Sequence, residues 1–228
     1  MTDTTSAGRE ERPPRVLLLY YSYTGQSQKV LETAGEVFRA RGCEVNKAQI
    51  EFTDPRYAEK FSRFPMRRVW PDMMSVLGAQ KRGETGEIKI PDEASDGDYD
   101  LICIGSPTWW QTVSMPIRSF LKSDEARKLL SGKPFAVFVV CRLYWRENLE
   151  AVRELAGQQG GRYVDEIHFT YPGDSLRSML SLTSYLGSGE YRQKYLGLRI
   201  PPTNVQPEQL EQTRAFADRL ADGLFGKG

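Results

Sequence analysis

The chain has 228 residues, of which 39% are hydrophobic and 27% charged, a composition that suits a packed globular fold and excludes general disorder. Its 31 Lys and Arg nearly balance 30 Asp and Glu, so no whole-molecule field attracts nucleic acid or an anionic membrane, and such binding would need a local patch. The longest apolar runs have only the length of strands, which excludes a membrane-spanning helix; we therefore predict no nucleic-acid and no membrane partner.

The N-terminal segment and the cysteines indicate the compartment. Residues 1–14 are polar and charged, which is typical of a disordered lead-in and lacks the apolar stretch of a secretory signal. Three scattered cysteines without C-x-x-C spacing favour a reducing cytoplasm. The single histidine, His168, has no Cys or His near it at ligand spacing, so we predict no metal site.

From residue 15 onward, apolar runs of strand length alternate with amphipathic segments. The expected strands are 15–21, 43–50, 101–105, 134–141 and 163–171. The expected main helices are 27–41, 116–122, 124–130, 148–157 and 207–224. This alternation, with the most apolar strands central, predicts an α/β fold with a doubly wound, five-stranded parallel sheet and helices on both faces.

Two connections are much longer than the usual two to six residues. About 50 residues separate the second strand from the third, and about 35 separate the fifth strand from the last helix. We interpret them as insertions, at about 52–90 and 172–206, in a single domain that covers residues 15–228. Both follow the carboxyl ends of strands, the edge at which open α/β sheets bind ligands.

The turn after the first strand has the composition of an anion site. It reads Ser22-Tyr23-Thr24-Gly25-Gln26-Ser27 and leads directly into the first amphipathic helix. Hydroxyls and free amides at a helix N-terminus, where the dipole is positive, suit a phosphate. The turn matches neither G-x-x-x-x-G-K-[ST] nor G-x-G-x-x-G, so a nucleoside-triphosphate loop and a dinucleotide fingerprint are both excluded.

Aromatic residues follow the next two central strands. The third strand leads into Gly105-Ser106-Pro107-Thr108-Trp109-Trp110-Gln111, and the fourth into Arg142-Leu143-Tyr144-Trp145. A single Trp is more often part of a core. In a strand order of 2-1-3-4-5, however, these loops and the first turn meet at one switch point. Their joint placement predicts a site for a flat aromatic ligand with a phosphate tail.

Two segments carry a resemblance to a known family. Residues 20–27 (YYSYTGQS) resemble the FMN-phosphate loop of the flavodoxin superfamily, and residues 99–121 (YDLICIGSPTWWQTVSMPIRSFL) are similar to its third strand, first flavin loop and following helix. The match extends over most of residues 15–224 apart from the insertions. It implies a flavodoxin-like fold with FMN as cofactor.

The resemblance also implies which residues hold the FMN. Those that would bind the phosphate are Ser22, Thr24, Gly25, Gln26 and Ser27. Those that would flank the isoalloxazine are Pro107, Thr108, Trp109 and Trp110. Those that match the second flavin loop are Cys141, Arg142 and Tyr144. Gln26 and Ser27 stand where many family members have Asn and Thr, and both replacements keep a polar contact.

Charge and the insertions favour an enzyme over an electron carrier. Flavodoxins that act as carriers are strongly acidic, whereas this chain is balanced. We therefore expect an FMN-dependent oxidoreductase that takes electrons from NAD(P)H and passes them to a quinone-like or other planar acceptor. The alternatives are a flavodoxin-like electron-transfer protein reduced by a partner reductase, and a flavin-free binding protein. Because flavin carries the chemistry, no protein residue is assigned as catalytic.

The insertions leave further alternatives open. Residues 55–82 contain seven Lys or Arg against Glu59 and Asp72, interleaved with aromatic and Met residues. They either fold over the flavin, with arginines receiving an anionic group such as the NADPH phosphate, or form a solvated basic helix face. The apolar stripe in residues 173–206 is typical of a core or subunit contact. Related enzymes often complete their flavin pockets across a dimer interface, so the resemblance implies a homodimer.

Overall fold

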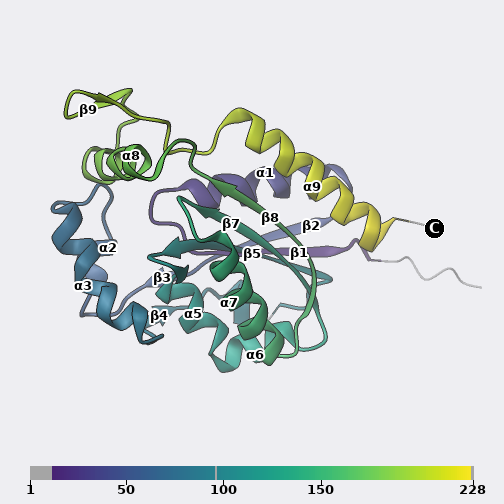
Figure 1. Cartoon of the computed structure of the whole chain (residues 1–228). Helices are drawn as coiled ribbons and strands as arrows, with labels where there is room; N and C mark the ends of the chain where they lie inside the picture. The colour runs from purple at the N-terminus through teal and green to yellow at the C-terminus, as the bar shows by residue number, and fades with distance from the viewer. Residues whose placement is uncertain (1–11, 96, 227–228) are drawn as a thin grey trace, which may run out of the picture.

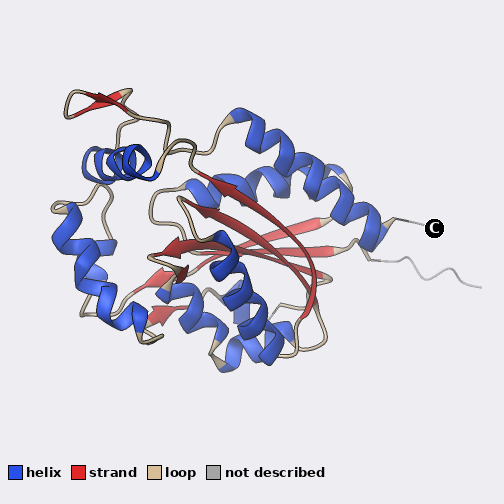
Figure 2. Cartoon of the chain, in the orientation of Figure 1, coloured by secondary structure: helices blue, strands red, loops and turns tan. Residues whose placement is uncertain are grey.

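The centre of the computed structural model, which describes residues 12–95 and 97–226, is a parallel sheet (Figures 1 and 2). Its strand order is β2-β1-β5-β7-β8, and each neighbouring pair is parallel. The strands are β1 (Arg15–Tyr20), β2 (Glu44–Gln49), β5 (Leu101–Trp109), β7 (Pro134–Cys141) and β8 (Arg162–Thr170). The predicted fold class and the predicted order 2-1-3-4-5 are therefore confirmed.

Helices cover both faces of this sheet (Figure 1). One face carries α1 (Gln26–Ala40) and α9 (Pro207–Phe225). The opposite face carries α4 (Asp92–Ser95), α5 (Met115–Leu121), α6 (Asp124–Leu130) and α7 (Trp145–Gln158). Within the described ranges, no helix combines the length and the apolarity that crossing a membrane requires.

The apolar pattern of each element explains these layers. The central strands are buried on both faces, so their side chains divide between two hydrophobic clusters, one on each side of the sheet. Leu18 belongs to the cluster that contains residues of α1 and α9, whereas its neighbour Leu17 belongs to the cluster that contains residues of α5. In α1 the residues Val30, Ala34 and Phe38 are fully buried, which is the four-residue spacing of one helix face.

Both insertions lie beyond the carboxyl ends of the central strands (Figure 1). The first is closed at its base by β3 (Glu51–Phe52), which pairs antiparallel with β4 (Ile88–Lys89). It carries α2 (Ala58–Phe61) and α3 (Val69–Lys81). The second carries α8 (Ser175–Ser188) and a hairpin of β9 (Lys194–Tyr195) and β10 (Leu198–Arg199).

Two boundaries differ from the sequence prediction by more than one residue. The third strand was expected to end at residue 105, but β5 continues to Trp109 because its end pairs antiparallel with β6 (Thr112–Val113). Helix α7 begins at Trp145, three residues before the predicted start at Asn148. Thr108 and Trp109 are therefore held in a hairpin, not in a free loop.

The predicted lead-in lies only in part within the described residues. Residues 1–11 are outside them. Residues 12–14 lie along the amino edge of the sheet, where Arg12 Nη1 donates to Asp100 Oδ2 at 2.8 Å and the amide of Glu44 donates to the carbonyl of Pro14 at 2.8 Å.

The crossing of α1 over β5 gives a first testable prediction. A Cβ at Gly105 would lie 2.6 Å from Leu31 Cδ1 and 2.9 Å from Tyr20 Cβ. Because both neighbours are buried, Gly105→Val should lower the free energy of unfolding by about 2 kcal/mol, measured by urea denaturation. Gly223→Ala is the control: its Cβ meets nothing within 4 Å, so it should raise stability by about 0.5–1 kcal/mol. Equal effects would contradict the packing described.

Candidate functional site

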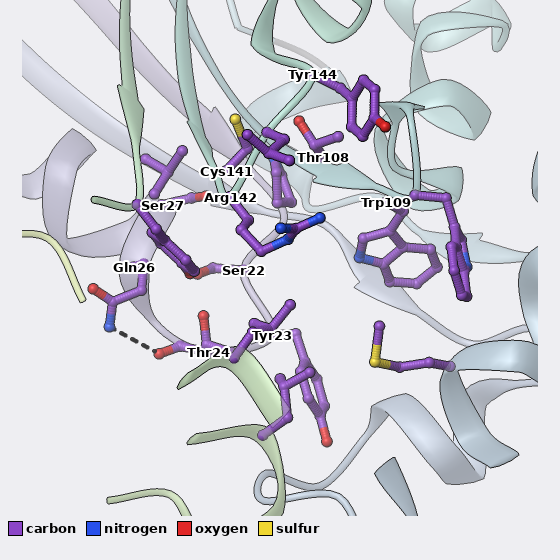
Figure 3. A pocket seen from close by; sticks show the side chains of 18 of the residues that line it. Ser22, Tyr23, Thr24, Gln26, Ser27, Thr108, Trp109, Cys141, Arg142 and Tyr144 are labelled. Carbon is purple, nitrogen blue, oxygen red and sulfur yellow. Dashed lines mark hydrogen bonds between the residues drawn. The ribbon is translucent and has the colours of Figure 1, made fainter. Parts of the chain in front are cut away.

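A cavity of about 350 Å³ opens at the carboxyl edge of the sheet, where three loops and both insertions meet. Figure 3 shows Ser22 and Thr24 on one side of it and Trp109 on the other, with Arg142 between them. The sequence-predicted residues that line it are Ser22, Thr24, Gln26, Ser27, Pro107, Thr108, Trp109, Trp110, Cys141, Arg142 and Tyr144. Gly25, the remaining predicted residue, shapes the turn without lining the cavity.

The turn from β1 into α1 presents unpaired amides. Gly25 is the N-cap of α1 and has φ 77°, a left-handed conformation that other residues adopt only with strain. It offers no side chain to cap the helix. Ser22 Oγ accepts from the amide of Gln28 at 3.4 Å, whereas the amides of Gln26 and Ser27 precede the first intrahelical bonds. With no acidic residue in this first turn, the positive end of the helix is available to an anion.

The side chain of Gln26 has a role that the sequence did not predict. It points away from the cavity (Figure 3) and joins the turn to the second insertion. Its Nε2 donates to Tyr191 Oη at 2.9 Å, and its Oε1 accepts from the amide of Val205 at 2.8 Å. These hydrogen bonds tie the Gln26 side chain to the second insertion. Gln26 is also among the residues that line the cavity, and its contact with a phosphate stays a prediction.

Tyr23, in the same turn, holds the first insertion. Its hydroxyl donates to the carbonyl of Arg63 at 2.7 Å, and its ring meets Phe61 and Phe64 edge to face with centroids 5.8 and 5.6 Å apart. Burial, with a smaller effect of Asp72, raises the pKa of Tyr23 to about 12. This phenol therefore stays protonated and keeps donating at neutral pH.

A buried amide that sequence reasoning missed fixes the end of β5. Asn148 is fully buried in α7. Its Oδ1 accepts from Ser106 Oγ at 2.7 Å, and its Nδ2 donates to Thr108 Oγ1 at 2.8 Å. The sequence did contain a signal for its burial, because Asn148 lies four residues before the core residue Val152, on the same face of an amphipathic helix.

Trp109, at the end of β5, packs against the first insertion. Its ring lies 4.7 Å from Phe61 and meets Tyr21 edge to face at 5.6 Å. Its carbonyl accepts from Gln80 Nε2 at 3.1 Å. The next residue, Trp110, turns the hairpin with φ 58°. Both indoles line the cavity, and Trp109 also packs against the hydrophobic cluster on that side of the sheet.

Behind this hairpin lies a buried cation that the sequence did not reveal. Arg118 is 4% exposed, and burial lowers its pKa. It donates to Gln80 Oε1 and to the carbonyls of Glu84 and Val113 at 3.1–3.2 Å. Arg118 and Gln80 therefore tie α3 to the hairpin, which gives the cavity wall a fixed position.

The loop after β7 forms the third side of the cavity. Burial raises the pKa of Cys141 to about 12, so this thiol is neutral at physiological pH. Arg142 Nη1 donates to Ser178 Oγ at 3.0 Å and to the carbonyl of Ser175 at 3.2 Å, which places a cation between the loop and α8. Tyr144 is the N-cap of α7 with φ 64° and is exposed.

The two insertions close the remaining side. The amide of Met66 donates to the carbonyl of Leu186 at 2.7 Å, joining the first insertion to α8. The apolar residues that the insertions contribute to the lining are Phe61, Met66, Met73, Val76, Met179, Leu182 and Leu186. Among the described residues, Arg142 is the one Lys or Arg that lines the cavity. The first insertion thus covers the cavity with its apolar side, while its arginines lie outside.

Comparisons with known proteins bear on the fold and on one activity. No protein-family model matches the chain. A curated relative from Archaeoglobus fulgidus, named NAD(P)H dehydrogenase (quinone), is 28% identical over 127 residues. That match covers 54% of this chain and 60% of the relative, so the chain spans less than two thirds of the relative's length.

Solved structures with similar folds include two flavodoxins and a flavoprotein. A flavoprotein in complex with FMN from Lactobacillus acidophilus has a TM-score of 0.52 and 19% identity, covering 68% of this chain and 93% of that one. Flavodoxin 1 from Bacillus cereus has a TM-score of 0.52 and 13% identity, covering 92% and 99%. An archaeal flavodoxin has a TM-score of 0.51 and 12% identity, and the match covers 92% of this chain and 98% of that one. The chain therefore has the flavodoxin fold, which confirms the fold that the resemblance implied.

The Asn148 network gives a prediction for the site. Asn148→Ala should lower the free energy of unfolding by about 2 kcal/mol, because the hydroxyls of Ser106 and Thr108 lose their buried partner. Gln158→Ala, on the exposed side of the same helix, should change it by less than about 0.5 kcal/mol. Thermal and urea unfolding of the two variants provide the comparison. Equal stabilities of the two variants would show that the network does not support β5.

Proposed function

We propose that this protein is an FMN-dependent oxidoreductase that transfers electrons from NAD(P)H to a quinone-like or other planar acceptor. The observation that carries the proposal is the composition of one cavity. The turn after β1 contributes amides and hydroxyls to the cavity, and the loops after β5 and β7 contribute aromatic side chains. Apolar side chains from the two insertions form the remaining wall. A phosphate-bearing planar cofactor and an apolar substrate both find complementary surfaces there.

The residues of the turn fit the phosphate of FMN. The left-handed Gly25 leaves open space where a Cβ would stand, with nothing within 4 Å. Ser22, Thr24 and Ser27, which carry hydroxyls, line the cavity at the same turn. Trp110 and Tyr144 line the region between the two flavin loops and would hold the ring system. When bound, FMN supplies the hydride and electron chemistry, so the protein needs no acid or base of its own.

The wall supports an enzyme more than a carrier. A protein that only exchanges electrons with larger partners gains from an open flavin edge, whereas a substrate site gains from excluding water. Here Phe61 and Met66 are nearly fully buried, and Gln80 and Arg118 fix the wall behind them. The lining is mainly apolar, which suits an uncharged planar acceptor. The name of the Archaeoglobus relative is consistent with this substrate class.

Anaerobic stopped-flow mixing of the FMN-loaded protein with NADH or NADPH tests the proposal. The visible flavin band should bleach without any added reductase, and a quinone should restore it. Met73→Glu, which places a carboxylate in the apolar wall, should lower the rate of reoxidation by a quinone at least about tenfold while FMN stays bound. Met74→Glu is the matched control, because Met74 is 50% exposed and outside the lining.

Two outcomes would contradict the proposal. A protein that binds FMN but is reduced only through a partner reductase is an electron-transfer protein, the alternative that the sequence left open. A protein that binds no FMN uses the cavity for another ligand.

A further inference from the structure

The exposed apolar side chains gather at one end of the molecule. Among the described residues, eight large apolar or aromatic side chains are exposed. They lie on the first insertion (Trp70, Met74), on the loop after β7 (Leu143, Tyr144) and on the second insertion (Leu176, Tyr191, Leu196, Leu198). All three segments stand at the carboxyl edge of the sheet (Figure 1). We call these eight residues the apolar rim.

The hairpin tip shows that part of this rim does not serve folding. Leu196 is 77% exposed and has φ 48°, a left-handed conformation that disfavours a leucine. A Gly or Asn would turn the chain there at lower cost. Leu176, in the first turn of α8, is 66% exposed. Protruding leucines of this kind bury little of their apolar surface within the described chain and suit burial in an external apolar medium.

Two of the segments that carry the apolar rim are also rich in cations. Residues 59–74 and 174–199 carry eight Lys or Arg but four Asp or Glu. The cations are Lys60, Arg63, Arg67, Arg68, Arg177, Arg192, Lys194 and Arg199, and the anions are Glu59, Asp72, Asp174 and Glu190. Carboxylates pair with Arg177 and Arg192. Within residues 12–95 and 97–226, no carboxylate forms an ion pair with the other six.

We propose that the apolar rim docks on the surface of an anionic lipid membrane. Such a surface accepts leucines and aromatic rings at the depth of the headgroups and attracts the cations around them. A second copy of the chain fits less well, because a symmetric contact would bring these unpaired cations against each other. The near-neutral total charge predicted no membrane partner without a local patch, and the rim provides that patch.

Docking in this way would connect the membrane to the cavity. Leu143 and Tyr144 belong to the rim, at 37% and 39% exposure, and also line the cavity. The cavity mouth would therefore face the lipid, and the acceptor would be a lipid-soluble quinone drawn from the bilayer. This consequence rests on the proposed function, whereas the docking itself does not.

Vesicle flotation without flavin, NAD(P)H or quinone tests the docking separately. The full chain should float with vesicles of phosphatidylcholine mixed with phosphatidylglycerol, and much less with phosphatidylcholine alone. Leu196→Ser with Leu198→Ser should lower the partition coefficient at least about tenfold. Arg67→Gln with Arg68→Gln should lower it about 30-fold, since each cation near an anionic surface contributes about 1 kcal/mol.

The control removes the same charge elsewhere. Arg127→Gln with Lys128→Gln lies on the exposed face of α6. This variant should float nearly as well as the unaltered protein if the position of the cations, and not the total charge of the protein, determines binding to the vesicles. Circular dichroism confirms that each variant is folded. Absence of flotation with anionic vesicles, or equal flotation of all variants, overturns the proposal. So does a dimer in solution that dissociates in the Leu196→Ser, Leu198→Ser variant, because the rim would then be a subunit interface.

Discussion

The turn from β1 into α1 is the constraint on which the rest of the site depends. A left-handed Gly25 ends the strand and starts the helix without a side-chain cap, so the first amides of α1 remain unpaired beside the cavity. Pairing these donors within the protein would remove the anion site. The neighbouring residues are used differently: Tyr23 and Gln26 hold the two insertions in place. One short turn therefore both presents the free amides of the proposed anion site and positions the structure that covers it.

The two insertions cover the cavity at the carboxyl edge of the sheet. They meet each other through the Met66 to Leu186 hydrogen bond, and Gln80 of the first insertion donates to the carbonyls of Trp109 in β5 and Val113 in β6. Arg118 of α5 donates to Gln80 and to the same Val113 carbonyl. Polar contacts at the back fix the wall, while apolar side chains line the front. This division explains why the first insertion is both basic and apolar. Its apolar residues cover the cavity, and its unpaired arginines lie on the outer surface.

Much of the fold could be predicted from the sequence, because the apolar strands and the spacing of Val30, Ala34 and Phe38 are local patterns. The lining of the cavity was largely predictable too, since the carboxyl ends of parallel strands converge. Interactions between segments far apart in the chain could not be predicted, because no local pattern records them. The role of Gln26 depends on Val205, 179 residues away, and the position of Trp109 depends on Phe61 and Gln80 of the first insertion. Nor could the separation of the basic and apolar sides of residues 55–82 be derived without their packing partners.

The affinities of the protein for FMN and for riboflavin test the central claim most directly, because the two ligands differ by the phosphate alone. Titration of the ligand-free protein should give FMN a dissociation constant at least about 100-fold lower than that of riboflavin, as two or more charge-assisted hydrogen bonds require. Ser22→Ala with Thr24→Ala should reduce this difference about tenfold while leaving riboflavin binding unchanged, because the backbone amides remain. Equal affinities for the two ligands in the unaltered protein would show that the turn does not hold a phosphate.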